Sequence, residues 1–581
     1  MSLHSDSPSG VTLGFDLVIQ LSIVRIPLAT SLAILALLPL GFAQRTEHFQ
    51  VSGSESIGNE HTGSSVAIDG EWAVVGDYGA TTPVGLATGA CVVYRQTELG
   101  WIEWQVLAPS TGAFLQQFGY DVALSGDELF VGARRGGADH AGRVFVYQLI
   151  NDHWEGVQEL RAFDGGPGFT YGQGLAIDDQ TLVVGSMGYP DETYVTGGLG
   201  TVYVYVRSTA GWVLSERIPL PNHSTTPHGL WSGFGWACAL EGDVLVVGAR
   251  GNGAHGMAFV YRRQSSGWVL ESSLHLPQFS PDIELLFGSA VDIDNGVIVI
   301  GAPVSGTPLF WGPSMVAFFE YETTSQTWGL KQTVRASDAS LSPGGLDKFG
   351  HALSLHGGRL IVGAYNGSYN SFHSGTAYIF EKTNGLWSEI ERLVPTDPNP
   401  ATGNPANFSS SVAFDGPSGR ILIGSLDTLV PGSPGNPGKA YFFDINQGPV
   451  VCAGAPNETL MPTRLTVTGS RRVADANLAL SVYDGPPGLM GIYLIGPGGP
   501  PVPFGVAGSL CVGQPFSRLT GIKAIGTEGS AMHQIDFTSG SAANLISPGA
   551  KLTFQFAHRD KVSGTGQATI NASDAIEVVF E

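Results

Sequence analysis

An internal repeat of about 58 residues is the feature that most constrains the fold of this chain. In each of seven copies, Phe-Gly or a near relative opens an alternating stretch, and a second stretch follows that ends in Val-Gly or Ile-Gly. A unit this short cannot bury both apolar faces of its strands alone, so it must pack against its neighbours. The glycines that end the second stretch are Gly76, Gly132, Gly185, Gly248, Gly301, Gly363 and Gly424.

Two further stretches complete each repeat and predict four strands per copy. The third is an alternating run rich in Tyr and Phe, at 91–94, 144–147, 202–205, 258–261, 317–321, 377–380 and 440–443. Six copies close with a stretch led by Trp101, Trp154, Trp212, Trp268, Trp328 or Trp387. Seven four-stranded units predict an all-β fold, a seven-bladed β-propeller over residues 44–447.

The seventh copy lacks a Trp-led strand after Asp444. An unassigned strand-like segment, Glu47 to Val51, precedes the first copy. We expect this segment to supply the missing fourth strand, because closing the ring in this way removes two exposed sheet edges.

These motifs resemble FG-GAP repeats, the repeats that form the head of integrin α subunits. The likeness rests on the Phe-Gly openings, on the spacing, and on the Val-Gly-Ala or Ile-Gly-Ala stretches at 131–133, 247–249 and 300–302. It covers residues 44 to about 447 and implies a seven-bladed propeller. Functions in the family range from adhesion to accessory domains of lipases, so the resemblance leaves the function open.

Many FG-GAP repeats carry a calcium loop between the first and second strands, patterned Asp-x-Asp-x-Asp-Gly-x-x-Asp. In this chain the corresponding turns, such as 124–129, 177–182 and 240–245, are short, and the nearest approach is 292–296. Calcium takes six to eight oxygens, which a tight hairpin does not offer. We therefore expect turn-forming roles for these residues, no integrin-type calcium site and no cofactor.

Composition agrees with short strands and excludes one class of partner. The 581 residues include 81 Gly and 35 Pro, and only 13% are charged, which disfavours long surface helices. The net charge of −22 is spread along the chain. An acidic surface repels phosphate backbones, so we expect no nucleic-acid partner.

The N-terminus predicts export. Residues 26–43 are uncharged, follow Arg25 and end in small residues, which is typical of a signal peptide cleaved after Ala43. The preceding residues 1–24 are unusual for a signal peptide and suggest a misassigned start, with initiation at Val24. We expect a secreted or cell-envelope protein. The alternative is that the segment stays uncleaved and anchors the protein, and this would be its only contact with a membrane.

Beyond Gln447 the repeat stops, and residues 448–581 predict a separate all-β domain. Alternating stretches at 478–484, 491–496, 551–560 and 575–580 are broken by Pro-Gly turns, which favours a β-sandwich of about 130 residues. Cys452 and Cys511 both lie in this domain and are a possible disulfide pair in an exported protein. Cys91 and Cys238 lie in predicted strands, and we interpret them as small buried apolar residues.

Loop lengths indicate which face of the propeller binds. Turns after the first and third strands are short, whereas connections after the second and fourth strands are long, as at 187–200, 222–233, 304–313 and 336–348. We call this second side the long-loop face. Variable loops on a rigid scaffold commonly carry binding sites, so we expect a protein or glycan ligand on this face. We expect the protein itself to be a monomer.

Four residues of these loops are candidate ligand contacts. Trp231 and Trp311 stand outside the repeat positions, and His223 and His228 lie beside Trp231 in sequence. Exposed rings can stack on a sugar or peptide; the alternative is packing beneath their own loop. The histidines at 140, 255 and 373 recur before third strands, but alternate blades hold them too far apart for one metal ion.

Catalytic motifs are absent from the sequence. There is no His-Glu-x-x-His, no Gly-x-Ser-x-Gly and no phosphate loop. We therefore expect a non-catalytic adhesion or binding scaffold without catalytic residues. The alternative is a carbohydrate-active or lipase-like enzyme with residues from several blades in the central channel. Three or more converging carboxylates or histidines in that channel would favour the enzyme.

The loop tryptophans generate a first testable prediction. If Trp231 and Trp311 form a ligand platform, the mature protein binds on a glycan array, and Trp231→Ala and Trp311→Ala each weaken that binding about tenfold or more, the usual effect of losing an aromatic anchor. Variants that bind as well as the wild-type protein would contradict the platform.

Overall fold

The fold is that of a computed structural model. In the repeat region the structure describes residues 43–46, 49–51 and 61–445, without 98–99, 111–114, 167, 189–198, 222–231, 253–254, 277–284, 305–313, 339–346, 367–374, 396–406 and 427–437. Beyond residue 449 it describes 450–452, 464–468, 478–483, 486, 488–504, 508–512, 515–519, 523–526, 531–535, 545–561 and 568–580.

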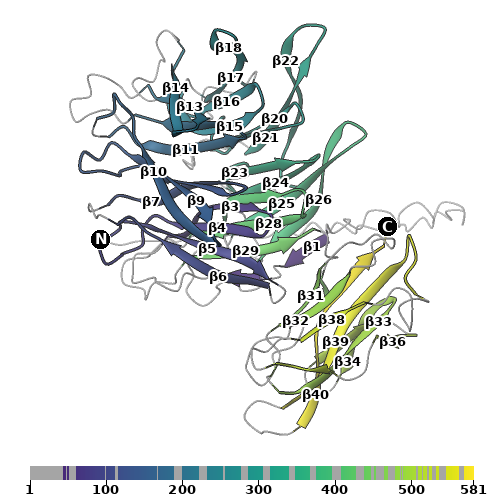
Figure 1. Cartoon of the computed structure of the whole chain (residues 1–581). Helices are drawn as coiled ribbons and strands as arrows, with labels where there is room; N and C mark the ends of the chain where they lie inside the picture. Colours follow the sequence, from purple (N-terminus) through teal and green to yellow (C-terminus); the bar gives the residue numbers. More distant parts are fainter. Residues whose placement is uncertain are drawn as a thin grey trace, which may run out of the picture. The chain divides into compact units, whose positions relative to one another are not determined.

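Seven antiparallel sheets follow one another along the repeat region (Figure 1). The first three comprise β3 Thr62–Asp69, β4 Trp72–Asp77, β5 Ala90–Thr97 and β6 Gly100–Leu107; β7 Phe118–Ser125, β8 Glu128–Ala133, β9 Arg143–Ile150 and β10 His153–Leu160; β11 Tyr171–Asp178, β12 Thr181–Ser186, β13 Thr201–Ser208 and β14 Gly211–Pro219. The next two comprise β15 Phe234–Glu241, β16 Val244–Ala249, β17 Met257–Gln264 and β18 Gly267–Leu274; β19 Val291–Asp294, β20 Val297–Ala302, β21 Met315–Glu322 and β22 Thr327–Val334. The last two contain β23 Ala352–His356, β24 Arg359–Ala364, β25 Thr376–Thr383 and β26 Leu386–Val394; β27 Phe408–Asp415, β28 Arg420–Ser425 and β29 Lys439–Asp444. The predicted all-β fold of four-stranded blades is confirmed.

The N-terminal segment completes the seventh sheet. Strand β2, Phe49–Val51, pairs antiparallel with β29, so that Phe49 lies opposite Phe442. This pairing was predicted for the segment from Glu47 to Val51. The sequence did not predict that β1, Ala43–Thr46, would add a fifth strand to the sixth sheet, parallel to β26.

The apolar cores lie between neighbouring sheets and not within them. One cluster joins the first and second sheets and buries Phe118 against Cys91 and Trp72. Equivalent clusters join each later pair, and a last one packs Phe442 of the seventh sheet against Tyr94 and Trp101 of the first. A single repeat therefore has no core of its own, which explains why the unit recurs.

Glycines allow the sheets to approach this closely. The glycine one residue before the end of each second strand lies against the backbone of the Phe-Gly position of the next sheet, where a methyl group would overlap the neighbouring carbonyl oxygen. The same holds for Gly424 of the seventh sheet and Gly63 of the first. The contacting pairs are Gly76 with Gly119, Gly132 with Gly172, Gly185 with Gly235, Gly248 with Gly288, Gly301 with Gly350, Gly363 with Ser409, and Gly424 with Gly63.

The C-terminal region forms its own sheets. One contains β30 Val450–Cys452, β33 Met490–Gly496, β36 Ser517–Arg518, β37 Lys523–Ala524, β39 Lys551–Lys561 and β40 Ala568–Val579. A second contains β31 Arg464–Thr468, β32 Ala479–Tyr483 and β38 Ala531–Gln534; a third pairs β34 Gly498–Phe504 with β35 Gly508–Val512. Leu480 and Val482 of the second sheet share one core with Tyr493, Phe554 and Phe556 of the first, which is the packing of a β-sandwich.

The glycine contacts predict an unusual sensitivity to a single methyl group. We expect Gly185→Ala to lower the free energy of unfolding by about 3 kcal/mol, because the new Cβ would overlap the carbonyl oxygen of Gly235. Gly156→Ala is the matched control: it also lies in a strand, but its Cβ would make ordinary contact with the Tyr147 ring, so we expect a change within about 0.5 kcal/mol. Thermal or urea unfolding measures both, and equal effects would contradict the packing role.

Candidate functional site: the central cavity

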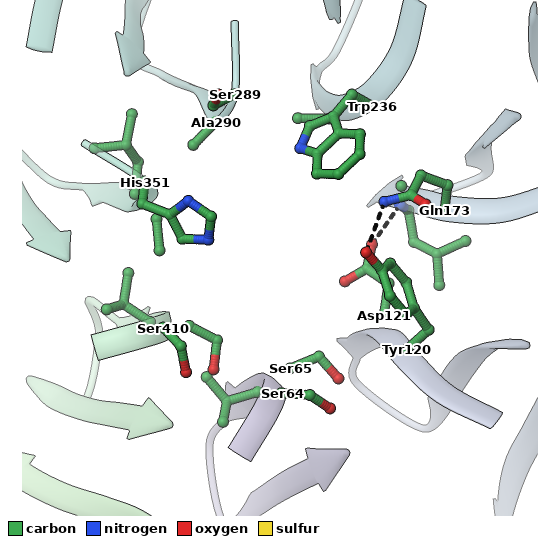
Figure 2. Close-up of a pocket in the computed structure, with 18 of the residues that line it drawn as sticks. Ser64, Ser65, Tyr120, Asp121, Gln173, Trp236, Ser289, Ala290, His351 and Ser410 are labelled. Atoms are coloured by element: carbon green, nitrogen blue, oxygen red, sulfur yellow. Dashed lines mark hydrogen bonds between the residues drawn. The ribbon is translucent and has the colours of Figure 1, made fainter. Parts of the chain in front are cut away.

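A cavity of about 400 Å³ lies where the first strands of all seven sheets converge. Each sheet contributes the residue directly after its Phe-Gly position or the equivalent pair. Figure 2 shows these side chains around an open centre, with Trp236, Gln173 and Tyr120 on one side and His351 and Ser410 on the other. The seven residues are Ser64, Tyr120, Gln173, Trp236, Ser289, His351 and Ser410.

A repeated bulge directs these side chains inward. In the second sheet the pairing with β8 skips from Phe118 to Asp121, which leaves Gly119 and Tyr120 outside the ladder. Gly119 has φ +82°, a conformation that favours glycine. The same skip occurs at the start of β3, β11 and β27, and in β15 a longer one runs from Phe234 to Cys238. Bulges re-aim side chains in this way, so the Phe-Gly motif itself creates the lining of the cavity.

One side of the cavity is aromatic and cationic. The Arg134 guanidinium stacks 3.7 Å from the centre of the Tyr120 ring, and Tyr120 packs against Tyr78 with ring centres 5.5 Å apart. Arg250 lies over Trp236, 3.1 Å from the ring centre. Such stacks hold the rings in place while leaving the guanidinium charge near the cavity.

Arg134 also anchors this side through neutral partners. Its Nε donates to Gln117 Oε1 at 2.7 Å, and its Nη1 lies 3.4 Å from Gln173 Oε1. Gln173 Nε2 in turn donates to the Tyr120 hydroxyl at 3.2 Å. Among the residues that the structure describes, Arg134 forms no ion pair.

Serines of the lining tie neighbouring sheets together. Ser65 Oγ donates to the carbonyl of Gly119 at 3.0 Å, and Ser411 Oγ donates to the carbonyl of Gly63 at 2.9 Å. Both bonds connect a first strand to the next sheet. Their hydroxyl oxygens can still accept a hydrogen bond from a ligand.

Asp121 is the carboxylate of the described lining. Its Oδ2 accepts from the backbone N–H of Leu175 in the third sheet at 2.8 Å, and its Oδ1 accepts from Val122 N at 3.0 Å. Burial raises the pKa of Asp121 to about 7, against the lowering effect of these two bonds. The other sheets have Ser, Gly or Ala at this position, so the carboxylate is not repeated around the cavity. We interpret the main role of Asp121 as structural, because its hydrogen bond to Leu175 joins the second sheet to the third.

His351 is held as a neutral imidazole. Burial lowers its pKa to about 4, and the nearby cations Arg250 and Lys348 lower it further. Its ring packs edge-on against Tyr365 with centres 4.7 Å apart. At neutral pH it can therefore donate one hydrogen bond and accept another, but it carries no charge.

The acidic turn residues have a structural role that sequence reasoning did not specify. The turns between first and second strands are two residues long in most sheets, as predicted. The acid that ends a first strand accepts a hydrogen bond from the turn of the next sheet, including from the seventh sheet to the first. The pairs are Asp69 with Gly126 N, Asp178 with Gly242 N, Glu241 with Asn295 N, Asp294 with Gly357 N, and Asp415 with Gly70 N.

The loop residues predicted as ligand contacts lie outside the described residues. These are Trp231, Trp311, His223 and His228, together with His373. His140 is exposed, with Nδ1 3.3 Å from the carbonyl oxygen of Arg135. The described part of the chain contains no group of three or more His, Cys, Asp or Glu placed to hold a metal ion.

The cysteines divide into two kinds. Cys511 is disulfide-bonded, whereas Cys91 and Cys238 are free thiols. The side chain of Cys452 is not among those described, so its pairing with Cys511 stays a prediction. Cys91 is buried as expected; Cys238 is only half-buried and lines the cavity.

Sequence reasoning missed the cavity residues. The signal was nonetheless present: directly after the constant Phe-Gly position, the seven repeats carry Ser, Tyr, Gln, Trp, Ser, His and Ser. A position that varies inside a constant frame is typical of a recognition surface on a rigid scaffold.

Comparison with known proteins gives one family. The model of the FG-GAP repeat matches residues 101–147 and 328–380. Each match begins at the tryptophan of a fourth strand, in β6 or β22, and runs into the third strand of the next sheet. No curated protein gave a significant match. No helix with the length and apolarity of a membrane span occurs among the described residues.

The raised pKa of Asp121 predicts a pH-dependent stability. The pKa of Asp121 is about 7 in the folded state and that of an unfolded Asp is about 3.9, so folding favours the protonated carboxyl. The resulting stabilisation of the folded state is complete below about pH 4 and is lost as pH rises through about 7. We expect Asp121→Asn to reduce the loss of unfolding free energy between about pH 5 and pH 8 by about 1–3 kcal/mol. Asp127→Asn, at an exposed turn, is the control. Parallel stability curves for Asp121→Asn and the wild-type protein would contradict the assignment.

Proposed function

We propose that the chain is an extracellular or cell-surface binding scaffold, because two of its regions match the FG-GAP repeat and its repeat region forms seven blade-like sheets, a fold often found in binding scaffolds. It recognises a protein or glycan through the long-loop face, with the central cavity as the contact site. The observation that carries this proposal is the convergence of seven side chains, of five residue types, from equivalent positions on one cavity.

The residues packed between the sheets are nearly constant, whereas those that line the cavity vary, and this difference supports a role in recognition. Residues that hold neighbouring sheets together, such as Phe118, Phe234 and Phe287, are nearly constant and fully buried. The residues directed into the cavity differ in size and polarity. Small-molecule sites combine aromatic walls with a few placed polar groups, in cavities of about 300–1,000 Å³, and this cavity has both features.

A non-catalytic role is part of the proposal. Among the described lining residues there is one carboxylate, Asp121, and one imidazole, His351. Figure 2 shows them on opposite sides of the opening. A general acid or base must lie within hydrogen-bond reach of the proton that it transfers. The sequence-based criterion for an enzyme was three or more converging carboxylates or histidines, and the described lining has two. The lining therefore favours binding over a central-channel hydrolase.

Export is supported by two features. The uncharged stretch 26–43 after Arg25 is typical of a signal peptide. The disulfide at Cys511 indicates an oxidising compartment, because disulfides rarely persist in the cytosol. An exported chain meets the ligands that an adhesion scaffold binds.

Arrays of glycans and of extracellular peptides test this function. We expect residues 44–581 to bind at least one ligand, and Trp236→Ala to weaken binding about tenfold or more by removing an aromatic wall of the cavity. Leu386→Ala is the control, because Leu386 lies at a turn between third and fourth strands and is 66% exposed. A folded protein that binds nothing, or a Trp236→Ala variant that binds as the wild type does, would overturn the proposal.

A further inference from the structure

We propose that the central cavity binds a carboxylate-bearing sugar, such as a uronic acid residue of an acidic glycan. This inference rests on the proposed binding function and narrows it to one ligand class. It draws on the charge at the cavity, on the geometry of Arg134, and on the aromatic and hydroxyl groups that surround them.

Three cations lie at or near the cavity of this acidic chain. The sequence carries a net charge of −22, yet Arg134 lines the cavity, Arg250 lies over the lining residue Trp236, and Lys348 is close enough to lower the pKa of His351. The acids at the same end accept hydrogen bonds from neutral donors. Asp77 accepts from His61 N at 2.8 Å and from the hydroxyl of Thr62 at 2.7 Å. Asp121, the carboxylate of the described lining, accepts from the backbone of Leu175 and Val122, and burial raises its pKa to about 7, which reduces its negative charge at neutral pH. The local field therefore favours an anion.

Arg134 has the geometry of a carboxylate receptor. Its side chain is fixed by Tyr120 beneath the guanidinium and by the amides of Gln117 and Gln173 at its edge. These partners are neutral, and among the described residues Arg134 forms no ion pair. A fixed, planar guanidinium can bind a carboxylate through two parallel hydrogen bonds. These bonds are stronger than the hydrogen bonds that it forms with neutral groups. A purely structural role would account for the stacking of Arg134 on Tyr120, but it would not account for the place of Arg134 in the cavity lining.

The rest of the lining suits a sugar ring. Trp236, Tyr120 and Tyr78 offer aromatic surface, against which the C–H groups of a pyranose pack. Gln173 and the serines supply donors and acceptors for hydroxyl groups. A cavity of about 400 Å³ admits a small unit and not a folded surface. An acidic peptide side chain would match the arginine but would leave the hydroxyl partners unused, so the sugar is favoured.

The probe is a short oligogalacturonate, and its methyl ester is the matched neutral ligand. We expect residues 44–581 to bind the acid form at least tenfold more tightly than the ester, with affinity falling as salt rises. Arg134→Gln should reduce binding of the acid about tenfold or more and leave any binding of the ester unchanged. Arg420→Gln removes a cation outside the cavity and should change neither.

The outcomes separate this inference from the function on which it rests. Equal binding of acid and ester, unchanged binding by a folded Arg134→Gln variant, or binding of a glutamate-rich peptide but not of the acidic sugar would overturn the acidic-sugar assignment and leave a binding scaffold. A neutral glycan bound through Trp236 would have the same effect. Absence of binding to every glycan and peptide tested, with a normal unfolding transition, would overturn both.

Discussion

The structure depends on the close approach of backbone between neighbouring sheets at the glycine pairs. Gly185 and Gly235 illustrate it: a methyl group on the first would overlap the carbonyl oxygen of the second. This approach lets Phe234 lie fully buried between the third and fourth sheets, and it recurs from the seventh sheet to the first through Gly424 and Gly63. Since every apolar core lies between sheets, loss of this contact removes the reason for the sheets to associate.

The same local geometry connects stability with recognition. The bulge that accommodates Gly119 also frees Tyr120 from the strand ladder and turns it into the cavity. A frame of constant glycines and aromatics thus presents one variable residue per sheet at the centre. Acidic residues take a different part, because Asp69 and its equivalents bind the turn of the next sheet. Part of the negative charge therefore serves assembly, whereas cations stand at the cavity.

Much of the fold was predictable because its signals are local and repeated. Four strands per copy, the short hairpin turns and the role of Phe49 to Val51 in the seventh sheet follow from glycine, aromatic and alternating positions read one repeat at a time. The site was less accessible. Reasoning from loops led to Trp231 and Trp311, whereas the described structure draws attention to Trp236, which the sequence presents as one more residue after Phe-Gly.

The sequence by itself determined the number of sheets and their repeated strands, since each depends on residues within one repeat. The added strand β1 and the backbone contacts between sheets were decided by the tertiary structure. Tertiary structure alone decided which side chains share the cavity. Tyr120, Trp236 and His351 come from three different repeats, and only the convergence of the first strands on one axis brings them together. It also decided that Cys238 would line the cavity and that Arg134 would stack on Tyr120, because both depend on how a bulge orients its side chains in space.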